Sequence, residues 1–235
     1  MKSAPPGRWE ESQRRELDFW RNWSELAPYQ NLDVREYWAQ ELTRFDCPPH
    51  FFSGRRVLDL GCGPMGLIHF LDDAAERIRI DPLLHQYDSR MPLPDRQLSL
   101  AGIAEALPLA SSSIDIVICF NALDHMRDPA AALREIRRVL RPEGSLLLMI
   151  HTFPAWVLPV SWIDRLHPHH WTAAGFTAQI GAQFTVEHSE AVTRQFAIPA
   201  SKWLHPSSWK YHLANLLVKS TYVKATSPRL TAPGT

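Results

Sequence analysis

The sequence has few cysteines and no long apolar segment. Its three cysteines, Cys47, Cys62 and Cys119, are scattered and odd in number, so their spacing suits neither a zinc site nor a disulfide framework. No stretch approaches the roughly 20 apolar residues of a membrane-spanning helix. No apolar run follows the N-terminal residues, so we expect no signal peptide. A reducing cytoplasm is the simplest setting for such a chain.

The chain also lacks a net charge, with 25 basic and 25 acidic residues, so bulk attraction to nucleic acid is not expected. The charges are unevenly divided, because no Asp or Glu follows Glu190. The basic residues beyond it are Arg194, Lys202, Lys210, Lys219, Lys224 and Arg229. The residues after Glu190 therefore carry a formal charge of +6, and the first 190 residues carry −6. We interpret this basic end as a solvated basic rim; a surface for an anionic substrate, a membrane or RNA is the alternative.

A glycine-rich turn follows the first predicted strand, residues 56–60. Gly61, Gly63 and Gly66 interrupt the apolar pattern, and a helix is predicted from roughly 65 to 75. This order is typical of a nucleotide-binding corner, because glycines allow a tight turn and the helix N-terminus offers N–H groups. The spacing matches the dinucleotide fingerprint. However, Asp59 at the end of the strand would repel a pyrophosphate and suits an ammonium or sulfonium group.

Residues 57–64, which read VLDLGCGP, resemble motif I of the class I S-adenosylmethionine-dependent methyltransferases, of the type 11-like, small-molecule branch. Further segments follow in the order of that family: 80–81, 104–108, 113–117 and 140–144. The resemblance covers roughly residues 54–151 and concerns the cofactor more than the acceptor. It implies an α/β fold with a doubly wound, Rossmann-like, seven-stranded, mostly parallel sheet whose last strand is antiparallel. It also implies S-adenosyl-L-methionine as cofactor and S-adenosyl-L-homocysteine as product.

Periodicity alone predicts alternating strands and helices and hence a doubly wound parallel sheet. The predicted strands are 56–60, 77–80, 98–103, 114–120, 145–150, 183–190 and 220–225. Besides the helix after the glycine turn, helices are predicted after Asp128, from 172 to 180, and after Ser207 or Ser208. Two further helices with aromatic stripes, about 9–26 and from Asp33 to Phe45, precede the glycine turn.

These elements predict two parts. Residues 1–50 would form an N-terminal helical cover or lid, and residues 51–235 the main domain. The main domain would carry inserts near 152–170 and 191–218, which are rich in tryptophan, proline and histidine. We expect these inserts to build the acceptor pocket.

In an open α/β sheet, ligands bind beyond the carboxyl ends of the strands. The resemblance gives roles to residues at those ends. Asp59 would lie near the ammonium group of the cofactor, and Asp81, followed by Pro82, would accept hydrogen bonds from ribose hydroxyls. The other predicted cofactor-binding residues are Gly61, Cys62 and Gly63 in the turn, Ala104 and Glu105 beside adenine, and Asn121 at the methionine end.

Methyl transfer mainly requires alignment of nucleophile, methyl group and sulfur. A general base helps if the acceptor is a hydroxyl group, and histidine, with an ordinary pKa of about 6.5, suits that role. His151 is the first candidate by position and His125 the second; packing roles are the alternative for both.

The run from His167 to His170 invites a metal interpretation. Its proline and adjacent histidines do not set up the spacing of helical metal sites, and no Cys or Glu lies close in sequence. We therefore predict no metal site, and assign the run to the pocket lining or to a structured loop.

The leading hypothesis is a methyltransferase acting on a small molecule, at oxygen, in specialised metabolism or glycan tailoring. An RNA or protein methyltransferase using the basic C-terminal region is an alternative, although an Asn-Pro-Pro-Tyr-type signature is absent at residues 121–124. A cofactor-binding protein that does not methylate, or that catalyses a cyclisation, is another. An NAD-dependent oxidoreductase is disfavoured by Asp59.

Overall fold

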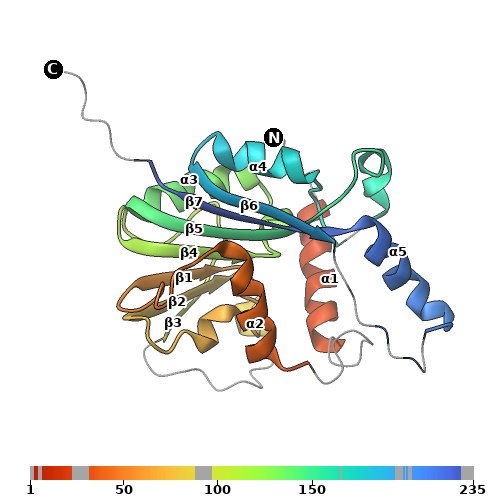
Figure 1. The fold of residues 1–235 in the computed structure, drawn as a ribbon, viewed down its shortest axis with the longest axis horizontal. Coiled ribbons are helices and arrows are strands. Elements are labelled where there is room, and N and C mark those ends of the chain that lie inside the picture. The colour runs from red at the N-terminus through yellow and green to blue at the C-terminus, as the bar shows by residue number, and fades with distance from the viewer. Residues whose placement is uncertain are drawn as a thin grey trace.

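The computed structural model describes residues 3–4, 7–22, 32–87, 97–164, 166–193, 198, 200 and 203–228. A seven-stranded sheet forms its centre (Figure 1). The strands are β1 Arg56–Leu60, β2 Glu76–Asp81, β3 Gln97–Ala101, β4 Ile114–Phe120, β5 Leu140–Thr152, β6 Thr185–Thr193 and β7 Lys219–Thr226. Their order is β3-β2-β1-β4-β5-β7-β6. Strands β1 to β5 pair in parallel, and β7 pairs antiparallel with both β5 and β6. The predicted fold class and the antiparallel last strand are therefore confirmed.

Burial along each strand follows its place in the sheet. The central strand β4 is almost continuously apolar, and Ile114, Val117 and Ile118 are fully buried, as expected for a parallel strand covered on both faces. The edge strand β6 instead alternates between exposed and half-buried residues. The core therefore lies around β1, β4 and β5, whose carboxyl ends face one side of the molecule.

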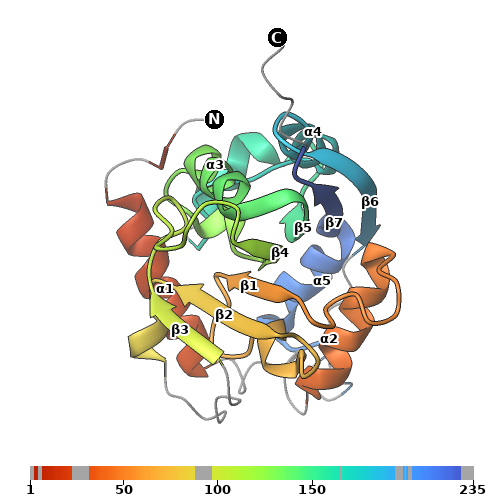
Figure 2. The ribbon, with the colours of Figure 1, turned by 90° about the vertical axis from the view of Figure 1, so that its left-hand side faces the viewer.

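Helices cover both faces of the sheet (Figures 1 and 2). Helices α3 (Pro129–Val139) and α4 (Ala173–Gly181) lie on one face, and α2 (Val34–Leu42) lies on the other. The predicted start of α3 is confirmed, and Asp128 caps this helix by accepting hydrogen bonds from the N–H groups of Ala130 (3.0 Å) and Ala131 (3.1 Å). Asp33 caps α2 in the same way, since it accepts the N–H of Glu36 at 3.0 Å.

Two helices lie at the carboxyl end of the sheet: α1 (Arg8–Asn22) and α5 (Trp209–Leu217). In Figure 1, α1 stands beyond the end of the strands rather than on a face of the sheet. The predicted end of the first helix, near residue 26, lies outside the described residues. Among the described residues, every helix is too short or too polar to cross a lipid bilayer.

The α-helix predicted over 65–75 is wrong. The chain forms only a short 3-10 turn, Leu67–Phe70. Leu67, Ile68 and His69 are all buried, which an amphipathic helix lying on a sheet could not achieve with consecutive residues. The carboxylate of Asp59 also accepts the N–H of Ile68 at 3.2 Å, and this bond fixes the turn.

Some element ends differ from the prediction by a few residues. Strand β5 begins at Leu140 instead of residue 145, because the chain pairs with Ile114 before an irregularity in register. Helix α2 ends at Leu42 and continues as a 3-10 turn to Phe45. None of these differences moves a strand end at the candidate site by more than two residues.

Candidate active site

A cavity of about 640 Å³ opens at the carboxyl ends of the parallel strands. Every residue that the sequence analysis proposed for the site lines this one cavity: Asp59, Gly61, Cys62, Gly63, Asp81, Pro82, Ala104, Glu105, Asn121, His125 and His151. The rule that ligands bind beyond the strand ends therefore brings these positions together correctly. Residues from α1, α2 and α5 complete the wall.

The glycine turn forms one side of the cavity. Gly61 and Gly63 have φ angles of 71° and 54°, in the left-handed region that favours glycine. A Cβ atom added to Gly61 would lie 2.4 Å from the Cβ of Ala122. The Gly61 N–H donates to the carbonyl of Ile80 at 2.7 Å. The turn is thus fixed against β2, and it lines the cavity.

Asp81 ends β2 beside this turn. Its Oδ2 accepts the N–H of Gly63 at 3.0 Å, and its Oδ1 accepts the N–H of Leu83 (2.8 Å) and the hydroxyl of Tyr87 (3.2 Å). Burial raises the pKa of this carboxyl above its usual range, although the donated N–H groups oppose the rise. Asp81 therefore ties the glycine turn to the end of the neighbouring strand.

Asp59 is the most deeply buried carboxylate at this end of the cavity, with 3% of its surface exposed. Its hydrogen bond from Ile68 favours the anion, but burial dominates and the charge of Asp81 adds to it. Together they raise the pKa of Asp59 to about 7. A Cβ on Gly66 would lie 2.5 Å from its Oδ2, so glycine is required there too. A buried carboxylate of this kind is a favourable site for a ligand ammonium group.

Asn121 and Glu105 occupy the ends of β4 and β3. The backbone of Asn121 is left-handed, with φ of 49°, and its buried Oδ1 has no hydrogen-bond partner among the described residues. An unpaired polar atom in a cavity is costly and is usually paired by a ligand or water. Glu105 has a structural role as well, because its Oε1 accepts the N–H of Asp128 at 2.9 Å at the start of α3.

Helix α1 covers the glycine turn. The ring of Trp20 lies 3.1 Å from the position that a Cβ on Gly63 would take, and its Nε1 donates to Glu16 at 2.7 Å. Trp38 of α2 donates from Nε1 to the carbonyl of Met65 at 2.8 Å. The sequence analysis predicted a cover but did not identify these contacts; the aromatic residues at helical spacing were the only signal available.

The two candidate bases lie in different surroundings. His151 stands at the end of β5, with its Nδ1 3.5 Å from the Oγ of Ser220. His125 belongs to a short 3-10 turn after β4, Leu123–His125, and its Nδ1 lies 3.6 Å from Glu16 Oε2. Its ring centroid is 4.6 Å from that of His167.

His167 belongs to the insert after β5. Its ring packs beside that of His125 and lines the same cavity. Its Nδ1 lies 2.7 Å from Oδ2 of Asp164, and His170 Nε2 lies 3.0 Å from the same oxygen. Burial alone would lower the pKa of His167, but the hydrogen bond to Asp164 and the charges of Asp124, Asp164 and Glu16 raise it to about 9. The pKa of Asp164 is held well below its usual range by the two imidazoles, against the effect of burial.

For the histidine run, only Cys and Glu were considered as partners close in sequence, whereas the acidic partner in the structure is an aspartate. Asp164 lies three residues before His167 and bonds to it. Asp124, whose Oδ2 is 4.0 Å from His167 Nε2, comes from a distant part of the sequence and becomes a neighbour only in the fold.

Comparisons with known proteins agree with this architecture. A family model described as a methyltransferase domain matches residues 58–148. Residues 58–148, which hold β1 to β4 and most of β5, are therefore similar to a methyltransferase domain. An uncharacterized methyltransferase of Mycobacterium tuberculosis is 37% identical over 101 residues, which are 43% of this chain and 41% of that protein. A ubiquinone biosynthesis O-methyltransferase of Pseudomonas aeruginosa is 29% identical over 140 residues, 55% of this chain and 56% of that protein.

The match therefore spans about half the length of these curated relatives. Among solved structures, the [4+2]-cyclase SpnF has a TM-score of 0.70 with 20% identity, covering 98% of this chain and 100% of that one. A chain from a complex between the Haloferax volcanii Trm112 methyltransferase activator and a methyltransferase has a TM-score of 0.69, also with 20% identity, covering 94% of this chain and 99% of that one. At this identity, both comparisons show that the chain shares its fold with these two proteins.

The basic C-terminal region falls only partly within the described residues. Of its six basic residues, Arg194, Lys202 and Arg229 lie outside them. The ammonium group of Lys224 is 3.5 Å from Glu187 and also donates to the carbonyl of Asp46 at 3.3 Å. This lysine is thus engaged within the fold and is a poor candidate for binding a polymer.

Proposed function

We propose that this protein binds S-adenosyl-L-methionine and transfers its methyl group to an oxygen atom of a small-molecule acceptor. The observation that carries the proposal is the placement of Asp59 and Asp81 beside the glycine turn, within one cavity that continues to a group of histidines. The first part of the cavity fits the cofactor, and the second part is available to the acceptor.

The residues fit the cofactor chemically. Asp59 offers a buried carboxylate to the ammonium group, and the unpaired Oδ1 of Asn121 offers a second acceptor at the same end. Asp81 would accept a ribose hydroxyl with the one lone pair, on Oδ2, that its three present donors leave. Ala104 and Glu105 would border the adenine. The bound cofactor supplies an electrophilic methyl group on a sulfonium centre.

The acceptor side is built from imidazoles and aromatic side chains. Catalysis there requires that the acceptor oxygen lie in line with the methyl group, and the cavity wall supplies this alignment. His151 is the first candidate for taking the hydroxyl proton, since it stands at a strand end facing the cavity, and His125 is the second. The O-methyltransferase named among the relatives supports oxygen as the methylated atom.

A second function is supported by one comparison. SpnF is named a [4+2]-cyclase, so this fold also serves a protein whose named reaction is not methyl transfer. In that case the chain would bind the cofactor without using its methyl group. An RNA or protein acceptor is less well supported, because Lys224 of the basic region is already paired.

Calorimetric titration of the purified protein with S-adenosylmethionine, S-adenosylhomocysteine and NAD tests the cofactor. We expect micromolar binding of the first two and none of NAD. Incubation with methyl-labelled cofactor and a panel of phenols, sugars and hydroxylated metabolites then tests the reaction. Binding of S-adenosylmethionine without label transfer to any acceptor class would favour the second function.

A further inference from the structure

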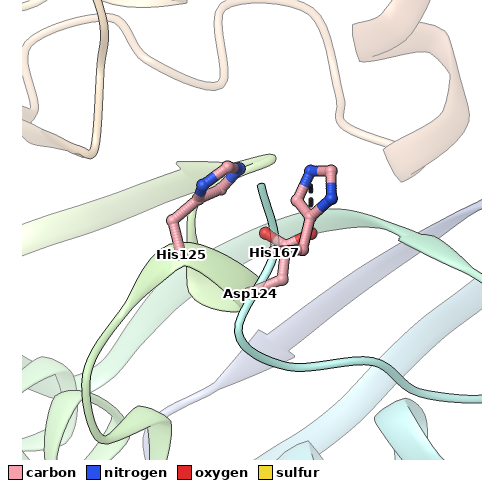
Figure 3. Close-up of side chains that lie close together, drawn as sticks. All are labelled: Asp124, His125 and His167. Carbon is pink, nitrogen blue, oxygen red and sulfur yellow. Dashed lines mark ion pairs between the residues drawn. The ribbon is translucent and has the colours of Figure 1, made fainter. Parts of the chain in front are cut away.

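We propose that Asp124, His125 and His167 form a binding site for a divalent transition-metal ion at the floor of the cavity. One nitrogen from each imidazole and one carboxylate oxygen lie within 4.8 Å of one another. Figure 3 shows the three side chains gathered on one side of the turn after β4, with the carboxylate between the rings. Two imidazoles and one carboxylate are a donor set typical of zinc, iron(II) and other borderline cations.

The hydrogen bonds around the three side chains leave the required atoms available. Among the described residues, Asp124 Oδ1 and His125 Nδ1 are buried and have no hydrogen-bond partner. Asp124 is only 3% exposed, so an unpaired oxygen on it is costly unless a ligand satisfies it. His167 directs Nε2 toward Asp124 at 4.0 Å. An ion between these atoms would satisfy all three after small side-chain rotations.

A second set, Asp164, His167 and His170, is also close enough to hold an ion, but its donor atoms are already used. His167 Nδ1 and His170 Nε2 both bond to Oδ2 of Asp164. We therefore assign Asp164 to orienting His167. A carboxylate that accepts from the outer nitrogen of a metal-binding imidazole fixes the ring and increases its basicity.

The charges of the region favour a cation. Asp124, Asp164 and Glu16 place three carboxylates around His125 and His167, and Glu16 Oε2 lies 3.6 Å from His125 Nδ1. Glu16 belongs to α1 and adds to the negative charge beside His125.

The site would be open on one side. His125 and His167 line the cavity, whereas Asp124 lies buried behind them. Three protein ligands leave at least one coordination position directed at the cavity. If the proposed function holds, an acceptor hydroxyl could take that position, and its pKa would fall on binding to the metal. The existence of the metal site does not depend on that step.

The test uses the full chain, freed of metal with a chelator and dialysed, and titrated with Co²⁺ and with Zn²⁺. We expect one equivalent of each to bind, with a visible Co²⁺ absorption band in the four- or five-coordinate range. His167→Gln, His125→Gln and Asp124→Asn should each lower the affinity by more than about 100-fold. Asp164→Asn, which removes only the orienting carboxylate, should lower it by about 10–100-fold. His85→Gln and Asp72→Asn, at exposed positions elsewhere, serve as controls and should bind normally.

His170→Gln distinguishes the two overlapping sets. The proposal requires that it reduce affinity by less than His125→Gln does. Absence of stoichiometric binding, binding that survives all three ligand substitutions, or an equal loss in His170→Gln would each overturn it. Each variant is also titrated with S-adenosylhomocysteine in the presence of chelator. Retained binding of that product shows that the variant is folded, and it separates failure of the metal site from failure of the proposed function.

Discussion

The carboxylate of Asp81 accepts the backbone N–H of Gly63 at 3.0 Å, across the ends of two adjacent strands. The acidic residue at the end of β2 thereby holds the glycine turn that follows β1 in place. The same carboxylate faces the cavity, so it has both a structural role and a place in the proposed ribose site.

Replacement of Asp81 by alanine should weaken binding of S-adenosylhomocysteine. The loss of hydrogen bonds to the ribose and of the contact with Gly63 corresponds to about 1–3 kcal/mol, or roughly 5- to 150-fold in the dissociation constant measured by calorimetry. Asp72→Ala, at an exposed position, is the control. Unchanged affinity in a folded Asp81→Ala protein would remove Asp81 from the cofactor site.

Gly61→Ala should destabilise the protein much more than Gly54→Ala. Both residues have left-handed φ angles, 71° and 68°, which cost a non-glycine residue about 1–2 kcal/mol. Only at Gly61 would the added Cβ also meet another atom, 2.4 Å away on Ala122. Overpacking adds roughly 1–3 kcal/mol, so we expect about 2–5 kcal/mol at Gly61 in urea unfolding. Equal losses at the two positions would show that the contact with Ala122 is not restrictive.

Cofactor binding should become tighter as the pH rises from 6 to 8. With its pKa raised to about 7, Asp59 is largely protonated at pH 6 and must lose that proton to pair with an ammonium group. The affinity for S-adenosylhomocysteine should therefore rise by about tenfold over this interval and then level off. Calorimetry in buffers of different ionisation enthalpy should also detect proton release near neutral pH. In Asp59→Asn, binding should be weaker and this pH dependence absent.

The same carboxyl group should reduce folding stability at neutral pH. Since its pKa in the folded state lies above the ordinary value of 3.8, the folded state holds the proton more tightly than the unfolded state does. Stability from this group is therefore present at low pH and is lost as the pH rises from about 4 to 7. Asp59→Asn removes this loss. At pH 8 the free energy of unfolding of the variant should therefore exceed that of the natural protein by up to about 4 kcal/mol. Chemical denaturation of both proteins at pH 5 and pH 8 measures this difference. A difference that is smaller at pH 8 than at pH 5 would contradict the raised pKa of Asp59.

Trp20→Ala should speed release of the bound cofactor. The Trp20 ring packs against Gly63 and closes the cavity over the turn, so its removal opens a path to solvent. We expect the dissociation rate of S-adenosylhomocysteine in stopped-flow displacement to rise by about tenfold or more. Trp156→Ala removes a tryptophan that is 69% exposed and should leave the rate unchanged. A slower release in Trp20→Ala would mean that this ring competes with the ligand for the site.

The sequence predicted the sheet and its strand ends well, because buried strands such as 56–60 and 114–120 consist mostly of apolar residues. The resemblance supplied the antiparallel β7, which periodicity could not. The helix predicted after the glycine turn was wrong, because Ile68 and its neighbours are apolar enough for either a helix or a turn. The N–H of Ile68 donates to Asp59, and this bond holds the segment as a turn.

For the site, the strand-end rule brought the cofactor candidates together, but it could not predict contacts between distant segments. Trp20 on Gly63 and Asp124 beside His167 join residues that are 43 positions apart in each case. Such contacts depend on how a helix or an insert returns to the sheet, and no local pattern encodes that path. The contact of Asp164 with His167 is different, because the two residues are only three positions apart. The sequence alone could have suggested Asp164 as a partner of His167.

The position of β7 has a consequence for synthesis of the chain. This strand lies between β5 and β6 and pairs with both along its whole length, yet it is the last of the seven to leave the ribosome. Until residues 219–226 emerge, β5 presents an unpaired, apolar edge on which another chain could pair. A protein cut before residue 219 should therefore aggregate rather than remain as a shortened, folded domain, even though every residue proposed to contact the cofactor would still be present.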